Sequence, residues 1–403
     1  MGSLWANLDF SGARRPLRYY QLRVCMKRAQ GRTIQATLNR HALSLSKVLG
    51  TLMSECGTLE HLTILDDVDL KTIYNDLLSA KDLTTLLIPN CMVPLDAVMS
   101  ILRASHRLVR AEFGGICRAN MGSLWPERLD NLRTLKLNAM RPLGGQLRNL
   151  VRISQRSRVL QMLTSLSQRG FLSMMPNITK LAMTKFNYLK IPVDPQPDYS
   201  TLKFLEHIDL SDSGLPSSVP LPASIRHVFL NGVPDMELPR LMGEEAESTN
   251  LKFLETLEVG HNIDMKARML IPILDPSRGV RKRVSLFRCI SIYDEDIREL
   301  AESGILEDIE HLNLGETGVR DDGIAFIANA APNLIRLNLS STGVSGVGVK
   351  ALLSRPDSKL ACLNLDGCMS VNIDAVEWAR SKGVHVQFQF VEKAGSGKKV
   401  RYG

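Results

Sequence analysis

Four of the eight histidines occupy the same place in a recurring short pattern, which is the arrangement most suggestive of shared chemistry. Each stands two residues after one apolar residue and directly before another, as in Leu205-Glu-His-Ile208. A row of imidazoles can bind a metal ion or respond to pH. Because only two of the four belong to consecutive copies, we interpret them as ordinary polar residues of a strand face. They are His61, His207, His227 and His311.

The remaining candidates for chemistry do not form a catalytic set. The seven cysteines include no CxxC pair, and the sequence has no GxSxG, HExxH or P-loop motif. Gly395-Ser-Gly-Lys-Lys399 echoes a phosphate-binding loop, but it lacks the leading glycine and no helix is expected after it. We therefore expect no catalytic residue, no cofactor and no metal ion, and the chain is not expected to be an enzyme.

Composition excludes several other classes. The chain has 403 residues, of which 44% are hydrophobic and 23% charged, and this balance is typical of a folded protein. Aromatic residues make up 5%, too few to favour a nucleic-acid binder built on base stacking. No apolar run is long enough to cross a membrane, and the first residues do not resemble a signal peptide. An intracellular protein of the nucleus, the cytoplasm or both is expected.

A repeat with a period of about 25 residues must position whatever does the binding. The pattern apolar-x-x-apolar-x-apolar begins at residues 59, 83, 108 and 132, and again at 309, 334 and 360. Such a period is typical of leucine-rich repeats, in which each copy contributes a short strand and a returning segment, often helical. Single copies bury too little, so copies stack. The prediction is an α/β leucine-rich-repeat solenoid, a horseshoe of about 13 parallel strands on the concave face, with weaker copies at 34–38, 284–286 and 384–388.

The last copies resemble the cysteine-containing class of this repeat. In Leu360–Val376, Cys368 would be the small buried residue after the strand and Asp374 the N-cap of the helix. Thr317 and Thr342 take the position of Cys368 in the two preceding copies, and the segment 321–323 takes the capping role. We expect Cys368 to fill space in the core.

The strand positions that leave the core predict a partner-binding face. The third and fifth residues of each copy point away from the core. They are basic near the middle of the chain, where residues 131–193 contain eleven Lys or Arg and no Asp or Glu. This predicts docking of a protein substrate that is acidic or phosphorylated; the alternative is a basic face that is merely solvated. The predicted partner-binding residues are Arg110, Lys136, Lys180, His207 and Asp209.

The predicted organisation has three parts. Residues 1–33 form an N-terminal cap, 34–390 the solenoid, and 391–403 a flexible basic tail. An insertion is expected at about 141–170, where the repeat period breaks.

The N-terminal segment carries a further resemblance. Leu4-Trp5 is followed by Leu8-Asp-Phe-Ser11 and Ala13-Arg-Arg-Pro16. This resembles the segment directly after the F-box in fungal F-box/leucine-rich-repeat proteins whose fuller members also carry tetratricopeptide repeats. The resemblance implies a substrate-recognition part of an SCF E3 ubiquitin ligase. The sequence begins after the expected position of the F-box, so no residue that contacts Skp1 is carried over, and Skp1 and a cullin are expected only if an F-box precedes it. The alternative is a leucine-rich-repeat scaffold or regulator with no ubiquitin role.

Overall fold

The computed structural model divides the chain into two compact units, described here separately. The N-terminal unit comprises residues 1–209 and 213–215, and the C-terminal unit comprises 210–212 and 216–403. The structure describes residues 6–12, 14–15, 19–39, 48–65, 70–91, 93–116, 128–139, 172, 174–185, 199–213, 221–233, 251–276 and 279–389.

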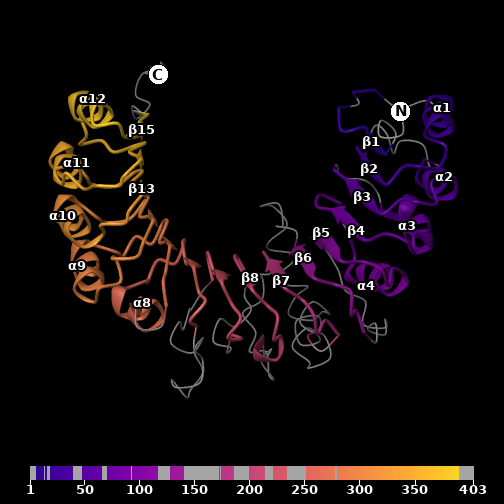
Figure 1. The fold of residues 1–403 in the computed structure, drawn as a ribbon, viewed down its shortest axis with the longest axis horizontal. Helices are drawn as coiled ribbons and strands as arrows, with labels where there is room; N and C mark the ends of the chain where they lie inside the picture. The colour runs from indigo at the N-terminus through magenta and orange to yellow at the C-terminus, as the bar shows by residue number, and fades with distance from the viewer. Residues whose placement is uncertain are drawn as a thin grey trace, which may run out of the picture. The chain divides into compact units, whose positions relative to one another are not determined.

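Parallel strands run through the N-terminal unit in chain order (Figure 1). The register pairs equivalent repeat positions, so that Leu62 lies beside Leu86 and Leu135 beside Leu181. In the described residues the strands are β1 (Asn7–Asp9), β2 (Gln35–Leu38), β3 (His61–Ile64), β4 (Thr85–Ile88), β5 (Arg110–Ile116), β6 (Thr134–Ala139), β7 (Lys180–Thr184) and β8 (His207–Asp209).

Helices return the chain between the early strands of this unit. They are α1 (Tyr19–Ala29), α2 (Val48–Glu55), α3 (Leu70–Ser79) and α4 (Leu95–Ala104), and a short 3₁₀ helix, η1 (Tyr199–Thr201), precedes β8. Figure 1 shows α1–α4 on one side of their strands, which leaves the other side of the sheet without a helical layer. We call this uncovered side the open face.

The C-terminal unit repeats the same plan, with its helices on one side of its strands and an open face on the other (Figure 1). Its described strands are β9 (His227–Phe229), β10 (Thr256–Glu258), β11 (Arg283–Ser285), β12 (His311–Asn313), β13 (Arg336–Asn338), β14 (Cys362–Asn364) and β15 (His385–Gln387). Its described helices are α8 (Ala267–Leu274), α9 (Asp294–Glu302), α10 (Asp321–Ala330), α11 (Gly346–Leu352) and α12 (Ile373–Ser381). The strands pair in parallel from β9 to β15, and successive helices contact one another.

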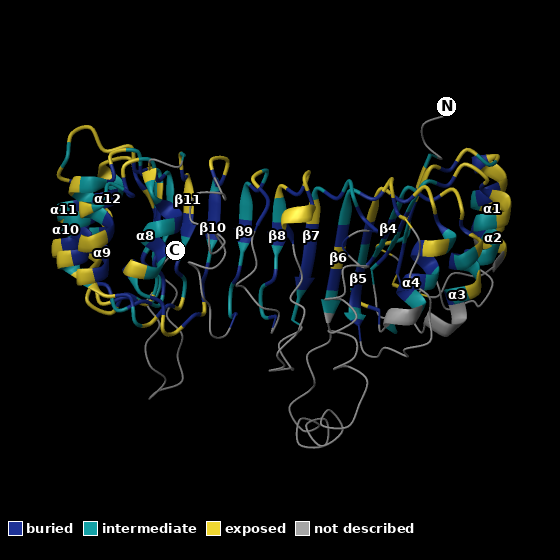
Figure 2. Cartoon of the chain, turned by 90° about the horizontal axis from the view of Figure 1, so that it is seen from below, coloured by how far each residue is buried: buried dark blue, intermediate teal, exposed yellow. Residues whose placement is uncertain are grey.

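The alternation of side chains along each strand explains the core. The middle residue of β12, Leu312, and that of β13, Leu337, are each 2% exposed, whereas the residues on either side of them reach solvent. Adjacent residues of a strand point to opposite faces, so each of these two strands sends one leucine inward and two side chains outward. Figure 2 shows buried positions between strands and helices. These stacked strand-and-helix units make the protein an α/β leucine-rich-repeat solenoid.

Helix capping differs from the sequence prediction. Asp374 lies inside α12, and the N-cap is Asn372, whose side chain accepts a hydrogen bond from Ala375 N at 3.0 Å. The prediction of Asp374 as the cap was therefore wrong by two residues. Asp321 does cap, but it caps the next repeat: its Oδ1 accepts from Ser345 N at 2.8 Å and Gly348 N at 3.1 Å, at the start of α11.

The turns after the strands are also stacked. Ser341 N donates to Asp366 O at 2.7 Å, and Glu316 N donates to Ser340 O at 2.7 Å. Ser341 has a φ of 55° and Gly367, the equivalent residue of the next copy, has a φ of 73°. This left-handed conformation turns the chain out of the strand, and it suits glycine better than residues with a Cβ.

Most of the predicted strands appear at the predicted places. The three weaker copies correspond to β2, β11 and β15, within one or two residues at each end. The structure adds β1, which pairs with β2 through Leu8 and Ala36 and was not predicted as a strand. β6 pairs directly with β7, so no described strand interrupts them, as expected for a repeat with an insertion. The predicted insertion at 141–170 and the tail at 391–403 lie outside the described residues.

Candidate functional site

Four of the five predicted binding residues line one hollow on the open face of the N-terminal unit. They are Lys136 on β6, Lys180 on β7, and His207 and Asp209 on β8, and the hollow has a volume of about 190 Å³. Arg110 on β5 is exposed in the same row as Lys180, separated from it by Thr134, but it does not line the hollow. Its binding role, like that of the other four, stays a prediction.

The N-terminal hollow is less basic than the sequence suggests. Glu112 on β5 stands beside Lys136 in the register and forms an ion pair with it, Nζ to Oε2, at 3.5 Å. Asp209 lies on the other side of Lys136, beyond Ala182. Two lysines therefore face two carboxylates among the lining residues, which leaves little net charge for attracting an acidic ligand.

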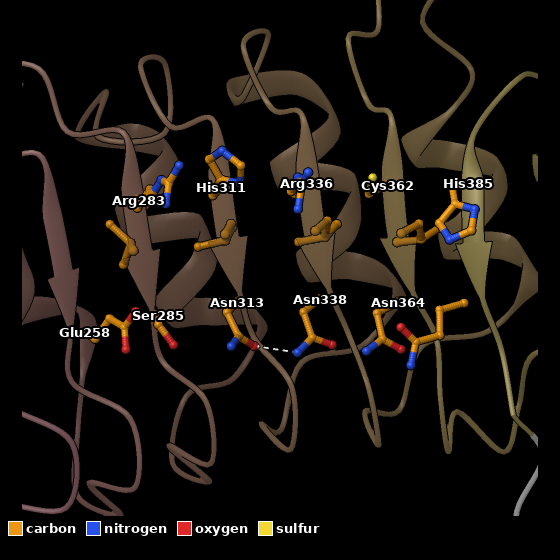
Figure 3. Close-up of a pocket in the computed structure, with 15 residues that line it drawn as sticks. Glu258, Arg283, Ser285, His311, Asn313, Arg336, Asn338, Cys362, Asn364 and His385 are labelled. Carbon is orange, nitrogen blue, oxygen red and sulfur yellow. Dashed lines mark hydrogen bonds between the residues drawn. The ribbon is translucent and has the colours of Figure 1, made fainter. Parts of the chain in front are cut away.

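A larger hollow, of about 360 Å³, lies on the open face of the C-terminal unit (Figure 3). It extends from β10 to β15, and we call it the C-terminal hollow. Strand register arranges its polar side chains in two parallel rows, which are the third and fifth positions of the repeat. The upper row is Arg283, His311, Arg336, Cys362 and His385, and the lower row is Glu258, Ser285, Asn313, Asn338, Asn364 and Gln387.

The guanidinium groups of the two arginines in the upper row have no hydrogen-bonding partner within the described part of the chain. Arg283 and Arg336 are exposed, and His311 separates them by one strand on each side. Glu310, which directly precedes His311 in the chain, is paired with Lys282, Nζ to Oε1, at 3.6 Å. Each guanidinium therefore retains its five N–H donors for a ligand.

The lower row presents amide groups in a fixed orientation. The Oδ1 atoms of Asn313, Asn338 and Asn364 each accept a hydrogen bond from the backbone N–H two residues later, at 3.1, 3.0 and 2.9 Å. Asn338 also donates from Nδ2 to Asn313 Oδ1 at 2.9 Å. Because the oxygens are used within the repeat, the amide nitrogens are the groups left to the hollow, and among the described residues Nδ2 of Asn313 and Asn364 has no acceptor.

The position of His311 affects its charge. Burial lowers its pKa below the usual 6.5, and the positive charges of Arg283 and Arg336 lower it further, while Glu310 acts in the opposite direction. The ring is therefore mostly neutral at pH 7, and the charge of the upper row at that pH comes mainly from the two arginines.

The four histidines singled out in the sequence lie on four different strands. His61 lies on β3, His207 on β8, His227 on β9 and His311 on β12. Among the described residues, no group of three or more His, Cys, Asp or Glu side chains is arranged to hold a metal ion. Cys368 is 1% exposed, and burial raises the pKa of its thiol above the usual value.

Sequence reasoning missed the C-terminal hollow although its signal was available. The predicted binding residues were chosen from strands in and beside the acid-free stretch in the middle of the chain, whereas Arg283, His311 and Arg336 lie much later. The third residue of each copy points away from the core, and in the last five strands these third residues are the members of the upper row. The fifth position of three successive copies, Asn313, Asn338 and Asn364, gives half of the lower row.

Comparisons with known proteins find similar chains among solved structures. No family model matches the sequence, and no curated protein matches it. Among solved structures, an internalin (inlF) from Listeria monocytogenes is 16% identical, with 85% of this chain and 83% of that chain covered and a TM-score of 0.47. A chain in the structure of the Rad7 and Elc1 complex of yeast is 15% identical, with 85% of this chain and 87% of that chain covered and a TM-score of 0.42. A chain in the structure of the TLR13–ssRNA13 complex is 12% identical, with 91% of this chain and 51% of that chain covered and a TM-score of 0.47. At these identities the similarity concerns the fold and carries no functional information.

None of the helices in the described part of the chain has the length and apolar character that crossing a bilayer requires.

Proposed function

We propose that this protein is a binding scaffold that holds a segment of a partner protein against its open faces. The observation that carries the proposal is the C-terminal hollow, where unpaired guanidinium and amide donors line a depression on a rigid sheet. Side chains supported by paired strands lose little further freedom on binding, which favours recognition. We further propose that the chain acts by binding and does not itself catalyse a reaction.

The finer proposal is that the bound protein is a substrate for ubiquitination. Its support is the resemblance of residues 4–16 to the segment after the F-box in fungal F-box/leucine-rich-repeat proteins. In such an assembly an F-box, Skp1 and a cullin would link the chain to the ligase, in the nucleus, the cytoplasm or both. The alternative is a scaffold or regulator that binds its partner with no effect on ubiquitination.

Site-specific photo-crosslinking in the host cell tests the scaffold proposal. A benzophenone amino acid is introduced at Ser285 in the C-terminal hollow or at Lys136 in the N-terminal hollow. The matched control is Lys350, an exposed residue of helix α11. We expect defined protein adducts at one or both of the hollow positions and none at Lys350. Equal labelling at all three positions, or adducts at Lys350 alone, would contradict the proposal.

The ubiquitin proposal has its own measurement. Once a crosslinked partner is identified, its half-life is compared in cells with and without this protein, with and without proteasome inhibition. A half-life that lengthens when the protein is removed, and that no longer depends on the protein when the proteasome is inhibited, supports a substrate receptor. A half-life that does not change favours the scaffold without a ubiquitin role.

A further inference from the structure

We propose that the C-terminal hollow binds an extended acidic peptide segment that crosses β11–β13 and places one carboxylate against Arg283 and another against Arg336. This inference deepens the proposed function by naming the chemistry of the partner segment, and it rests on that function.

The charge of the hollow favours an anion. Its lining residues include two arginines and only one carboxylate, Glu258, and that carboxylate accepts a hydrogen bond from Asn231 Nδ2 at 3.3 Å. Neither arginine has an internal ion pair in the described residues, in contrast to Lys136, which pairs with Glu112 in the N-terminal hollow. Charge-assisted hydrogen bonds to an incoming carboxylate are stronger than bonds between neutral groups.

The spacing of the arginines favours two separated carboxylates over one phosphate. Arg283 and Arg336 lie two strands apart, because His311 intervenes in the register. Neighbouring strands are about 4.8 Å apart, so the two backbone positions are separated by about 10 Å. An extended peptide in the polyproline II conformation has three residues per turn and rises about 3.1 Å per residue, so acidic residues at positions i and i+3 lie on the same side, about 9 Å apart, and match this separation. A single phosphate would need cations that converge on one point.

The lower row suits the backbone of such a peptide. Asn313 and Asn364 direct amide donors to the hollow, and their oxygens are occupied by the turns of their own repeats. An extended peptide has a carbonyl oxygen at each residue, and these are unpaired when the peptide is not part of a sheet. One row thus offers donors for side-chain carboxylates and the other offers donors for main-chain carbonyls.

The lining favours peptide over single-stranded nucleic acid. Among its residues there is no Phe, Tyr or Trp. Sequence-tolerant binding of single strands depends on such rings, on which bases stack. Without them, a nucleic acid could use only its phosphates in this hollow.

Fluorescence anisotropy with the full chain tests the inference. The probe is a labelled, otherwise Gly/Ser peptide with two Asp residues at i and i+3, compared with the same composition carrying the two Asp side by side. We expect the spaced peptide to bind more tightly. Arg283→Gln and Arg336→Gln should each weaken the binding of the spaced peptide about tenfold, the lower end of the range for a hydrogen bond to a charged group. Raising the salt concentration should also weaken the binding of the spaced peptide to the unmodified protein.

Matched variants distinguish the site from general charge attraction. Arg298→Gln removes the same charge from helix α9, and the triple variant Arg110→Glu, Lys136→Glu and Lys180→Glu reverses the N-terminal positions. We expect Arg298→Gln to leave binding unchanged and the triple variant to change it less than Arg283→Gln does. Binding that is lost only in the triple variant, or equally in all variants, would overturn the inference.

Two further probes complete the test. A peptide with one phosphoserine and no Asp should bind more weakly than the spaced Asp peptide, and an oligouridylate of similar length should not compete with it. Tighter binding of the phosphopeptide, or competition by the oligouridylate that Arg283→Gln abolishes, would overturn the assignment to separated carboxylates of a peptide. If the peptide does not bind while crosslinking at Ser285 persists, only this inference fails and the scaffold function stands.

Discussion

Asn338 on β13 donates a hydrogen bond from Nδ2 to Oδ1 of Asn313 on β12, at 2.9 Å, and the same Oδ1 accepts from the backbone of Gly315 at 3.1 Å. One side-chain oxygen therefore joins two neighbouring repeats and also fixes the turn that follows its own strand. The asparagine row has a structural role as well as a binding role, and the two can be separated.

Asn313→Asp should keep the acceptor and lose the donor that faces the hollow. We expect the free energy of unfolding to change by less than it does in Asn313→Ala, which removes both hydrogen bonds and should cost about 1–2 kcal/mol. The Asp variant should nevertheless bind an acidic peptide more weakly, because it places a negative charge in the hollow. Chemical denaturation and peptide titration measure the two effects. Equal destabilisation by the two substitutions would show that the oxygen has no structural role.

Asp321→Ala should destabilise the C-terminal unit by about 1–2 kcal/mol, because it removes an acceptor for two backbone N–H groups at the start of α11. Asp322→Ala is the matched control. Both aspartates lie in the first turn of α10, so they share any favourable effect of the helix dipole there. Asp322 is exposed, so Asp322→Ala should lower the free energy of unfolding by only a few tenths of a kcal/mol. Thermal denaturation of the two variants gives the comparison, and equal losses would assign the effect to α10 itself.

How far the sequence predicts this structure depends on how each feature is encoded. The strands follow from leucine periodicity, because every copy must bury the same position between the sheet and the layer behind it. β1 escaped prediction since it contributes a single buried residue, Leu8, and no complete copy of the pattern.

The candidate site is predictable only in part. The strand register makes Glu112 and Lys136 neighbours, and this relationship can be read from the repeat spacing. The sequence does not reveal that Glu310 pairs with Lys282 rather than with Arg283, because that choice depends on side-chain rotamers at the edge of the sheet. The unpaired state of Arg283, on which the hollow's chemistry depends, therefore required the structure.

Leu8→Ala should reduce stability by about 2 kcal/mol or more, since Leu8 is 5% exposed and caps the end of the core beside Ala36. Asn7→Ala, at an exposed position of the same strand, should have little effect. Deleting residues 1–33 should go further and cause aggregation or a clear loss of melting temperature, because it would expose the apolar edge of β2. An unchanged melting curve after the deletion would contradict the capping role of this segment.

Gly367→Ala should destabilise the turn after β14 for two reasons. Its φ is 73°, and a Cβ there would stand 2.7 Å from Ser341 Oγ. We expect a loss of about 1–2 kcal/mol from the backbone conformation, with the close contact in addition. The double variant with Ser341→Gly should recover the part due to the contact and relieve the positive φ of Ser341 itself. Melting temperatures of the two single variants and the double variant test this coupling; strict additivity would show that the contact is harmless.

His311 should titrate below the usual histidine pKa of 6.5, and its neighbours should set by how much. We expect Arg283→Gln and Arg336→Gln each to raise its pKa and Glu310→Gln to lower it, as followed by NMR of the ring protons. Because the folded state has the lower pKa, the unfolded chain binds the proton first as the pH falls. Folding stability should therefore be lost as the pH decreases from above 6.5 toward the folded pKa, and His311→Gln should remove this part of the pH dependence.

An acidic peptide in the hollow should raise the pKa of His311. The affinity of the protein for the peptide should therefore increase as the pH decreases through the same interval. A pKa of His311 that the peptide leaves unchanged would place the ligand away from β12.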